Sequence, residues 1–179
     1  MLDKIQQVVF RKEPAEEAVE DPFIEIGDPK RATTRNFFAQ LDDQLSRSRQ
    51  KDVLVFVHGF NVDFESALAR TAQVAADLPF NGALVSYSWP SQGSPTKYKD
   101  DGKIVDASVS AFSEFLTELG GRLPDDVRIN IVVHSMGNRL VVRALERLPR
   151  SFAQPKRFSN IVFCAPDVGV SEFKQKAPY

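Results

Sequence analysis

Short apolar runs alternate with segments of helical periodicity from residue 33 to the end of the chain. Four runs are nearly continuous and rich in β-branched residues, which is typical of strands buried on both faces. They cover residues 53–57, 83–87, 127–133 and 161–164. Alternation of such strands with helices predicts an α/β fold with a mostly parallel sheet covered by helices on both faces.

The segments between these runs predict four helices, each with one apolar face. The first buries Phe37, Phe38, Leu41 and Leu45, after a cap at Thr33 or Thr34. The second is capped by Asn61 or Asp63 and turns Phe64, Leu68, Thr71, Ala75 and Leu78 toward the core.

The third helix is expected to be long and continuous through Ser108, and to end at Gly120-Gly121. The fourth begins directly after Ser135 and faces the core with Leu140, Val141, Ala144, Leu145 and Leu148. Arg139, Arg143, Arg147 and Arg150 follow mostly helical spacing there. They indicate either a solvated helix face or a site for an anion or a partner.

Residues 1–32 have a different character, with many Glu, Asp and Pro residues and weak periodicity. This composition predicts an extended or loosely ordered lead-in. A short strand could lie within it, at residues 7–10 or 23–26. Residues 33–179 then form the folded core.

Composition narrows the function classes without choosing one. The chain has 179 residues, a net charge of −1 and 42% hydrophobic residues, which suits one globular domain and gives no electrostatic reason to bind nucleic acid. No apolar run approaches the roughly 20 residues of a membrane span. The start lacks the apolar region of a signal peptide, so a cytoplasmic location is expected. Cys164 is the single cysteine and is expected to be a small buried hydrophobe.

Three polar constellations follow predicted strands. Ser135 comes after the third strand, the segment His58-Gly59-Phe60-Asn61 after the first, and Asp167 after the fourth. The carboxyl ends of parallel strands share one rim of a sheet, so these groups are expected to meet there. A serine between a strand and an immediate helix is typical of a nucleophile elbow. An ordinary helix cap is the alternative for both Ser135 and Asp167.

The chain here resembles the α/β-hydrolase superfamily, and more narrowly a bacterial branch described only as α/β hydrolases of unknown function. Four motifs carry the resemblance, and their order and spacing make it specific. They are VFVHGFN at 55–61, SWPSQG at 88–93, HSMGN at 134–138 and APD at 165–167. The resemblance implies a three-layer α/β sandwich, of which this chain holds a partial core.

The resemblance also implies roles for individual residues. Ser135 would be the nucleophile, and the backbone N–H groups of Phe60 and Met136 would form the oxyanion hole. Asp167 would be the acid of the triad, and His58 would shape its loop. The implied activity is hydrolysis of a small ester or acyl substrate through an acyl-enzyme, as in esterases and lipases, with no cofactor and no metal.

Two departures from the family pattern matter. Val133 replaces the first glycine of G-x-S-x-G, which implies extra room between strand and helix. The general-base histidine is missing, because the two histidines, His58 and His134, both precede Ser135. We therefore expect an incomplete hydrolase core, with the base supplied by sequence outside these residues.

The missing base leaves two alternatives open. One is a non-catalytic module that binds a ligand or a partner. The other uses His58 as a relocated base, which requires its Nε2 within about 3.2 Å of the Ser135 hydroxyl. An incomplete sheet would also leave residues 161–164 as an apolar, uncharged edge strand, which predicts self-association.

Overall fold

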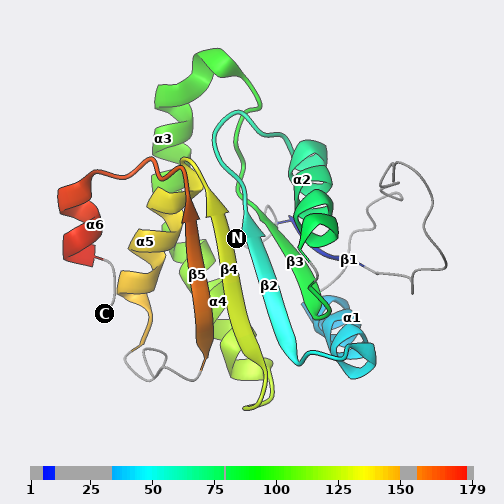
Figure 1. Ribbon diagram of the computed structural model, residues 1–179. Coiled ribbons are helices and arrows are strands. Elements are labelled where there is room, and N and C mark those ends of the chain that lie inside the picture. Colours follow the sequence, from blue (N-terminus) through cyan, green and yellow to red (C-terminus); the bar gives the residue numbers. More distant parts are fainter. Residues whose placement is uncertain (1–5, 11–33, 79, 150–156, 177–179) are drawn as a thin grey trace.

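The computed structural model describes residues 6–10, 34–78, 80–149 and 157–176. They form one five-stranded sheet with the strand order β1-β3-β2-β4-β5 (Figure 1). The strands are β1 (Gln6–Phe10), β2 (Asp52–Val57), β3 (Ala83–Ser88), β4 (Arg128–His134) and β5 (Phe158–Cys164). Strands β2 to β5 are parallel, and β1 pairs with β3 in the antiparallel direction. The predicted α/β class and mostly parallel sheet are confirmed.

Six α-helices and a short 3-10 turn connect these strands within the described residues. The helices are α1 (Thr34–Arg47), α2 (Phe64–Asp77), α3 (Tyr98–Ala107), α4 (Val109–Arg122), α5 (Gly137–Arg147) and α6 (Val170–Lys176). The turn, Pro95–Lys97, leads directly into α3. None of the helices in these ranges is long and apolar enough to cross a membrane.

Helices cover both faces of the sheet, as expected for a three-layer arrangement. On β2, Val53, Val55 and Val57 join the main core, which α1, α4 and α5 complete with buried side chains such as Leu41, Phe112 and Leu140. The intervening residues Leu54 and Phe56 point to the other face, because successive strand side chains alternate. Helix α2 lies on that second face, where the Thr71 hydroxyl donates to Ser86 Oγ of β3 at 2.8 Å.

Strand β5 is an edge of the sheet, as predicted for residues 161–164. Its one neighbour among the described strands is β4, and its face opposite the main core is open. Val162 is 48% exposed there, and Asn160 donates to Asn130 Oδ1 across the two strands at 2.8 Å. The expected self-association through this edge stays a prediction.

The lead-in contributes β1, at the first of the two places proposed for a strand. Its five residues pair with Leu84 to Ser88 of β3. The second place, residues 23–26, lies outside the described residues, as do the Thr33 cap and Arg150. Helix α1 begins at Thr34 and buries the four predicted residues, Phe37, Phe38, Leu41 and Leu45.

The predicted long third helix is wrong, because the chain forms α3 and α4 with a break at Ser108. Ser108 Oγ donates to the carbonyl of Ile104 at 2.8 Å, and such back-bonding of a serine bends a helix. The expected end at the glycine pair is also wrong. Helix α4 runs through both glycines to Arg122, and Leu123 N donates to Leu119 O at 3.1 Å.

Helix α2 is capped by Asp63, one of the two predicted caps. Its carboxylate accepts a hydrogen bond from Ser66 N at 2.7 Å. The buried face is rotated from the prediction, however, and consists of Ala67, Leu68, Thr71 and Ala72. Leu78 is 44% exposed, because the helix ends before it at Asp77.

Two of the arginines of α5 are partly buried in contacts with other segments, whereas Arg147 is exposed. Arg139 and Arg143 are 26% and 27% exposed, and each is ion-paired with a carboxylate outside the helix. Arg143 bridges Asp106 of α3 and Glu172 of α6, and its bond to Glu172 lowers the pKa of that carboxyl. Arg147 donates to Ser110 Oγ of α4 at 2.7 Å. These bonds fasten α3, α4 and α6 to α5.

Candidate active site

Ser135 stands at a sharp turn between β4 and α5. Its φ angle is 50°, in the left-handed region that costs a non-glycine residue energy. The strand ends at His134 and the helix begins at Gly137, so the turn has only two residues. The N–H of Ser135 donates to Cys164 O of β5 at 3.0 Å. This is the strained strand-to-helix geometry that the sequence pattern predicts for a nucleophile elbow.

Gly137 allows α5 to approach the loop after β2. A Cβ at this position would lie 2.4 Å from the carbonyl oxygen of His58 and 3.2 Å from Val133 Cγ2. Val133, the residue that departs from the family motif, is fully buried beneath this helix. The close approach of helix and loop therefore depends on the glycine after the serine.

Gly59 brings the histidine–glycine loop against the serine. A Cβ on Gly59 would lie 2.8 Å from Ser135 Cβ and 3.0 Å from the carbonyl oxygen of His134. Gly59 itself does not adopt a positive φ, and the positive φ of 57° in this loop belongs to Asn61. Glycine is required at 59 because its hydrogen leaves room for the serine side chain.

Each of the two expected oxyanion donors follows one residue of this contact in the chain. Phe60 follows Gly59 directly and packs against the core with its ring partly buried. Met136 is fully buried and precedes the first helical residue of α5. The first N–H groups of a helix have no partner within the helix and carry partial positive charge, which suits a developing oxyanion.

His58 is buried and engaged away from Ser135. Its Nε2 lies 3.1 Å from both Ser88 Oγ and the carbonyl oxygen of Trp89, and its Nδ1 lies 2.9 Å from Gly59 O. Trp89 Nε1 donates a hydrogen bond to the carbonyl oxygen of His58 at 2.8 Å, and the two rings stack with centroids 5.1 Å apart. Burial lowers the pKa of His58 to about 4. These contacts fit a loop-shaping residue and argue against a relocated base.

Asp167 lies beside the elbow, because its N–H donates to Ser135 O at 3.2 Å. Its carboxylate accepts the Tyr98 hydroxyl at 2.6 Å and Arg139 Nη2 at 3.0 Å on both oxygens. The bond to Asp167 raises the pKa of Tyr98. The carboxylate does not cap α6, which begins at Val170 after Gly169. Asp167 is thus close to the serine but already ion-paired.

Tyr98 and Arg139 are site residues that sequence reasoning missed. Tyr98 begins α3 and lies 69 positions from Asp167 in the chain. Its ring meets Phe60 edge-on, with centroids 5.2 Å apart, and Arg139 lies 5.7 Å from its centroid. By its spacing Arg139 belongs with the other arginines of its helix, and no local pattern around either residue points to the other.

A second missed group is the buried carboxylate of Asp101. This side chain is 0% exposed, and it accepts Ser91 Oγ at 2.7 Å and Gln92 N at 3.0 Å. Ser91 Oγ in turn accepts Val62 N at 3.4 Å. The network ties the loop after β3 to the loop after β2. Trp89, in the same loop, is 1% exposed and belongs to the core.

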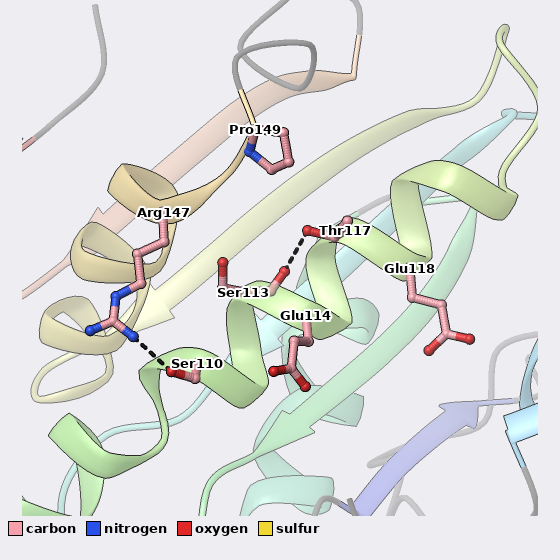
Figure 2. Close-up of a pocket in the computed structure, with 7 residues that line it drawn as sticks. All are labelled: Ser110, Ser113, Glu114, Thr117, Glu118, Arg147 and Pro149. Carbon is pink, nitrogen blue, oxygen red and sulfur yellow. Dashed lines mark hydrogen bonds between the residues drawn. The ribbon is translucent and has the colours of Figure 1, made fainter.

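A separate groove of about 470 Å³ lies between α4 and the end of α5 (Figure 2). It is lined by Ser110, Ser113, Glu114, Thr117, Glu118, Arg147 and Pro149. Since Arg147 ends α5 and Ser135 precedes its start, the groove lies at the far end of that helix from the elbow. It contributes nothing to the rim residues above.

The family model described as "Alpha/beta hydrolase of unknown function (DUF900)" matches residues 33–179. The chain belongs to this family. The superfamily resemblance seen in the sequence motifs is confirmed. In this α/β-hydrolase chain the described residues contain no group of three or more His, Cys, Asp and Glu side chains placed to hold a metal ion.

Two proteins that are similar to this chain are both longer than it. An uncharacterized protein, alr1448 of Nostoc sp., is 27% identical over 143 residues, which are 65% of this chain and 36% of that protein. The chain therefore spans about a third of the length of this curated relative. A solved structure, the siderophore hydrolase EstB from Aspergillus fumigatus, is 20% identical with a TM-score of 0.33, covering 65% of this chain and 36% of its own.

Proposed function

We propose that this chain is the nucleophile-bearing core of a serine hydrolase of the carboxylic-ester type. The observation that carries the proposal is Ser135 held at a φ of 50°, with Gly59 of the histidine–glycine loop packed on its side chain. Backbone strain of this kind persists where the surroundings over-determine it, and it clusters at active sites. Membership of an α/β-hydrolase family supports the same function.

In the proposed reaction the Ser135 hydroxyl attacks the acyl carbon of a small ester, and its proton passes to a general base. The N–H groups of Phe60 and Met136 stabilise the oxyanion of the tetrahedral intermediate. The alcohol leaves with a proton from the base, and water then releases the acid from the acyl-enzyme. Asp167 would orient the base from its place beside the elbow.

The general base in this proposal comes from sequence outside these residues. His58 is buried and bonded to Ser88 and Trp89, while His134 is exposed and precedes the serine. The chain alone should therefore turn over esters very slowly. Oxyanion donors and binding alone leave a residual acceleration of about 10³–10⁴ over water in serine proteases that lack triad members.

A second candidate function is a non-catalytic module that binds a ligand or a partner. The observation in its favour is the engaged carboxylate of Asp167, which Arg139 and Tyr98 already satisfy. A triad acid must accept a bond from its histidine. In this alternative the ion pair fixes the rim for binding, and Ser135 has no covalent role.

Covalent labelling with a fluorophosphonate separates the two functions. The experiment compares the chain with Ser135→Ala and with Ser94→Ala, which removes a hydroxyl bonded to Thr96 in the loop after β3. Labelling that is lost in Ser135→Ala and retained in Ser94→Ala supports the hydrolase. Because the chain lacks the base, labelling is followed over long exposure at high probe concentration, where a serine that faces oxyanion donors still reacts slowly. Absence of labelling in all three proteins under these conditions overturns the hydrolase in favour of the binding module.

A further inference from the structure

Asn138, in the first turn of α5, has a buried side chain that the proposed reaction does not use. It is 0% exposed. Its Nδ2 donates to Ser135 O at 2.6 Å and to Cys164 O at 3.2 Å. Both partners are carbonyl oxygens, which only accept hydrogen bonds, so the amide nitrogen must be the atom that faces them.

These bonds join the two loops that carry the proposed nucleophile and acid. Ser135 O also accepts the backbone N–H groups of Asn138 at 3.0 Å and Asp167 at 3.2 Å. Cys164 O, at the end of β5, also accepts the N–H of Ser135 at 3.0 Å. The Asn138 amide therefore closes a network that links the elbow to the turn after β5.

Both linked turns are strained. Ser135 has a φ of 50° and Ala165, two residues before Asp167, has a φ of 42°. Non-glycine residues keep such angles only where several contacts hold them. Asn138 contacts the carbonyl of Ser135 and the carbonyl immediately before Ala165, so one side chain restrains both turns.

The Asn138 side chain also lowers the stability of the fold. Its Oδ1 is buried without a hydrogen-bond partner, which destabilises a folded protein. The two carbonyls it contacts keep backbone donors without it, so no buried acceptor depends on this amide for its only bond. A buried polar group that the fold does not need, and that leaves an acceptor unpaired, points to a functional requirement.

We propose that Asn138 is a positioning residue for the acyl transfer at Ser135. Its amide fixes the position of the elbow relative to the turn before Asp167, which keeps the Ser135 hydroxyl aligned with the oxyanion donors. The inference rests on the proposed function, and Asn138 itself touches neither substrate nor leaving group.

The test compares Asn138→Ala and Asn138→Asp with Asn160→Ala as the matched control. Asn160 bridges the same two strands through Asn130, but on the open face of the sheet. Three quantities are measured for each protein. They are the rate and binding constants of fluorophosphonate labelling, the hydrogen exchange of the Asp167 amide, and the thermal midpoint of unfolding.

Asn138→Ala is expected to slow the bound labelling step by about tenfold to a hundredfold, as small misplacements of a reacting group do. The binding constant stays unchanged, exchange at Asp167 accelerates, and the thermal midpoint does not fall. Asn138→Asp shows the same loss at pH 8 and recovers part of it near pH 5, where a protonated carboxyl can donate one bond. Asn160→Ala labels like the unaltered chain.

Unchanged labelling and unchanged Asp167 exchange in Asn138→Ala overturn the inference. So does a slower rate that merely follows a lower thermal midpoint, since that marks a structural role alone. If the unaltered chain is not labelled at all, the proposed function fails. The exchange of the Asp167 amide then decides separately whether Asn138 holds the two turns together.

Discussion

The buried histidine of the loop after β2 makes the stability of this protein depend on pH. His58 is 0% exposed, and burial lowers its pKa from 6.5 to about 4. Between pH 4 and pH 6.5 the His58 imidazole is protonated in the unfolded chain and neutral in the folded chain. Stability is therefore fully present above pH 6.5 and is lost as the pH falls toward 4.

The size of this effect follows from the two pKa values. One pKa unit corresponds to about 1.4 kcal/mol, so the fall from 6.5 to about 4 represents between about 3 and 4 kcal/mol, all of it lost only below pH 4. At pH 5 about 2 kcal/mol of it should already be lost. A loss of that size is a large part of the 5–15 kcal/mol that typically holds a domain of this kind folded.

Urea denaturation of the chain and of His58→Gln between pH 7 and pH 5 measures the difference. Glutamine can still contact Ser88 or the Trp89 carbonyl but does not titrate, so the variant should lose less stability over this range. Asp63 and Glu172 have lowered pKa values, and their contribution is lost only at more acidic pH than this comparison covers.

A direct measurement uses the fact that the chain has two histidines. NMR titration should show one imidazole that stays neutral at pH 5, and the exposed residue is assigned with His134→Gln. Parallel stability curves for the chain and His58→Gln, or titration of the buried ring near pH 6.5, would refute the reasoning.

Three further predictions concern the rim and the sheet edge. Gly59→Ala places a methyl group 2.8 Å from Ser135 Cβ and should reduce fluorophosphonate labelling at least about tenfold. The control Gly121→Ala, where an added Cβ meets no atom within 4 Å, should label normally. Equal labelling of both variants would contradict the close contact. Gly137→Ala meets a backbone carbonyl at 2.4 Å and should lower the free energy of unfolding by about 1–3 kcal/mol in urea titrations, and an unchanged midpoint would count against it. Val162→Lys puts a charge on the exposed edge strand and should reduce self-association measured by light scattering. An unaltered chain that is monomeric at high concentration would contradict self-association through this edge.

Much of the fold was predictable because its signals are local. Continuous β-branched runs marked β2 to β5, and the four buried residues of α1 follow directly from helical spacing. The position of Ser135 between an apolar strand and a helix predicted the strained turn, and parallel strands predicted that Asp167 would lie near it. These features depend on periodicity and chain direction, which neighbouring residues express by themselves.

Other features depend on contacts between distant segments. The break at Ser108 goes with a side-chain hydrogen bond to the backbone, and the buried face of α2 depends on how that helix packs on the sheet. Helix propensity and spacing alone reveal neither feature. Gly59 is needed for space beside a serine 76 positions away, which local dihedral preferences do not reveal.

The sequence by itself determined the class of fold, the order of its strands along the chain and the rim where polar groups gather. Only the tertiary structure decided what each polar group does there. It paired Asp167 with Tyr98 and Arg139, buried His58 and Asp101, and aimed the Asn138 amide at two carbonyls. The physical reason is that hydrogen bonds and desolvation depend on which atoms meet in space, while periodicity records only which face of an element is buried.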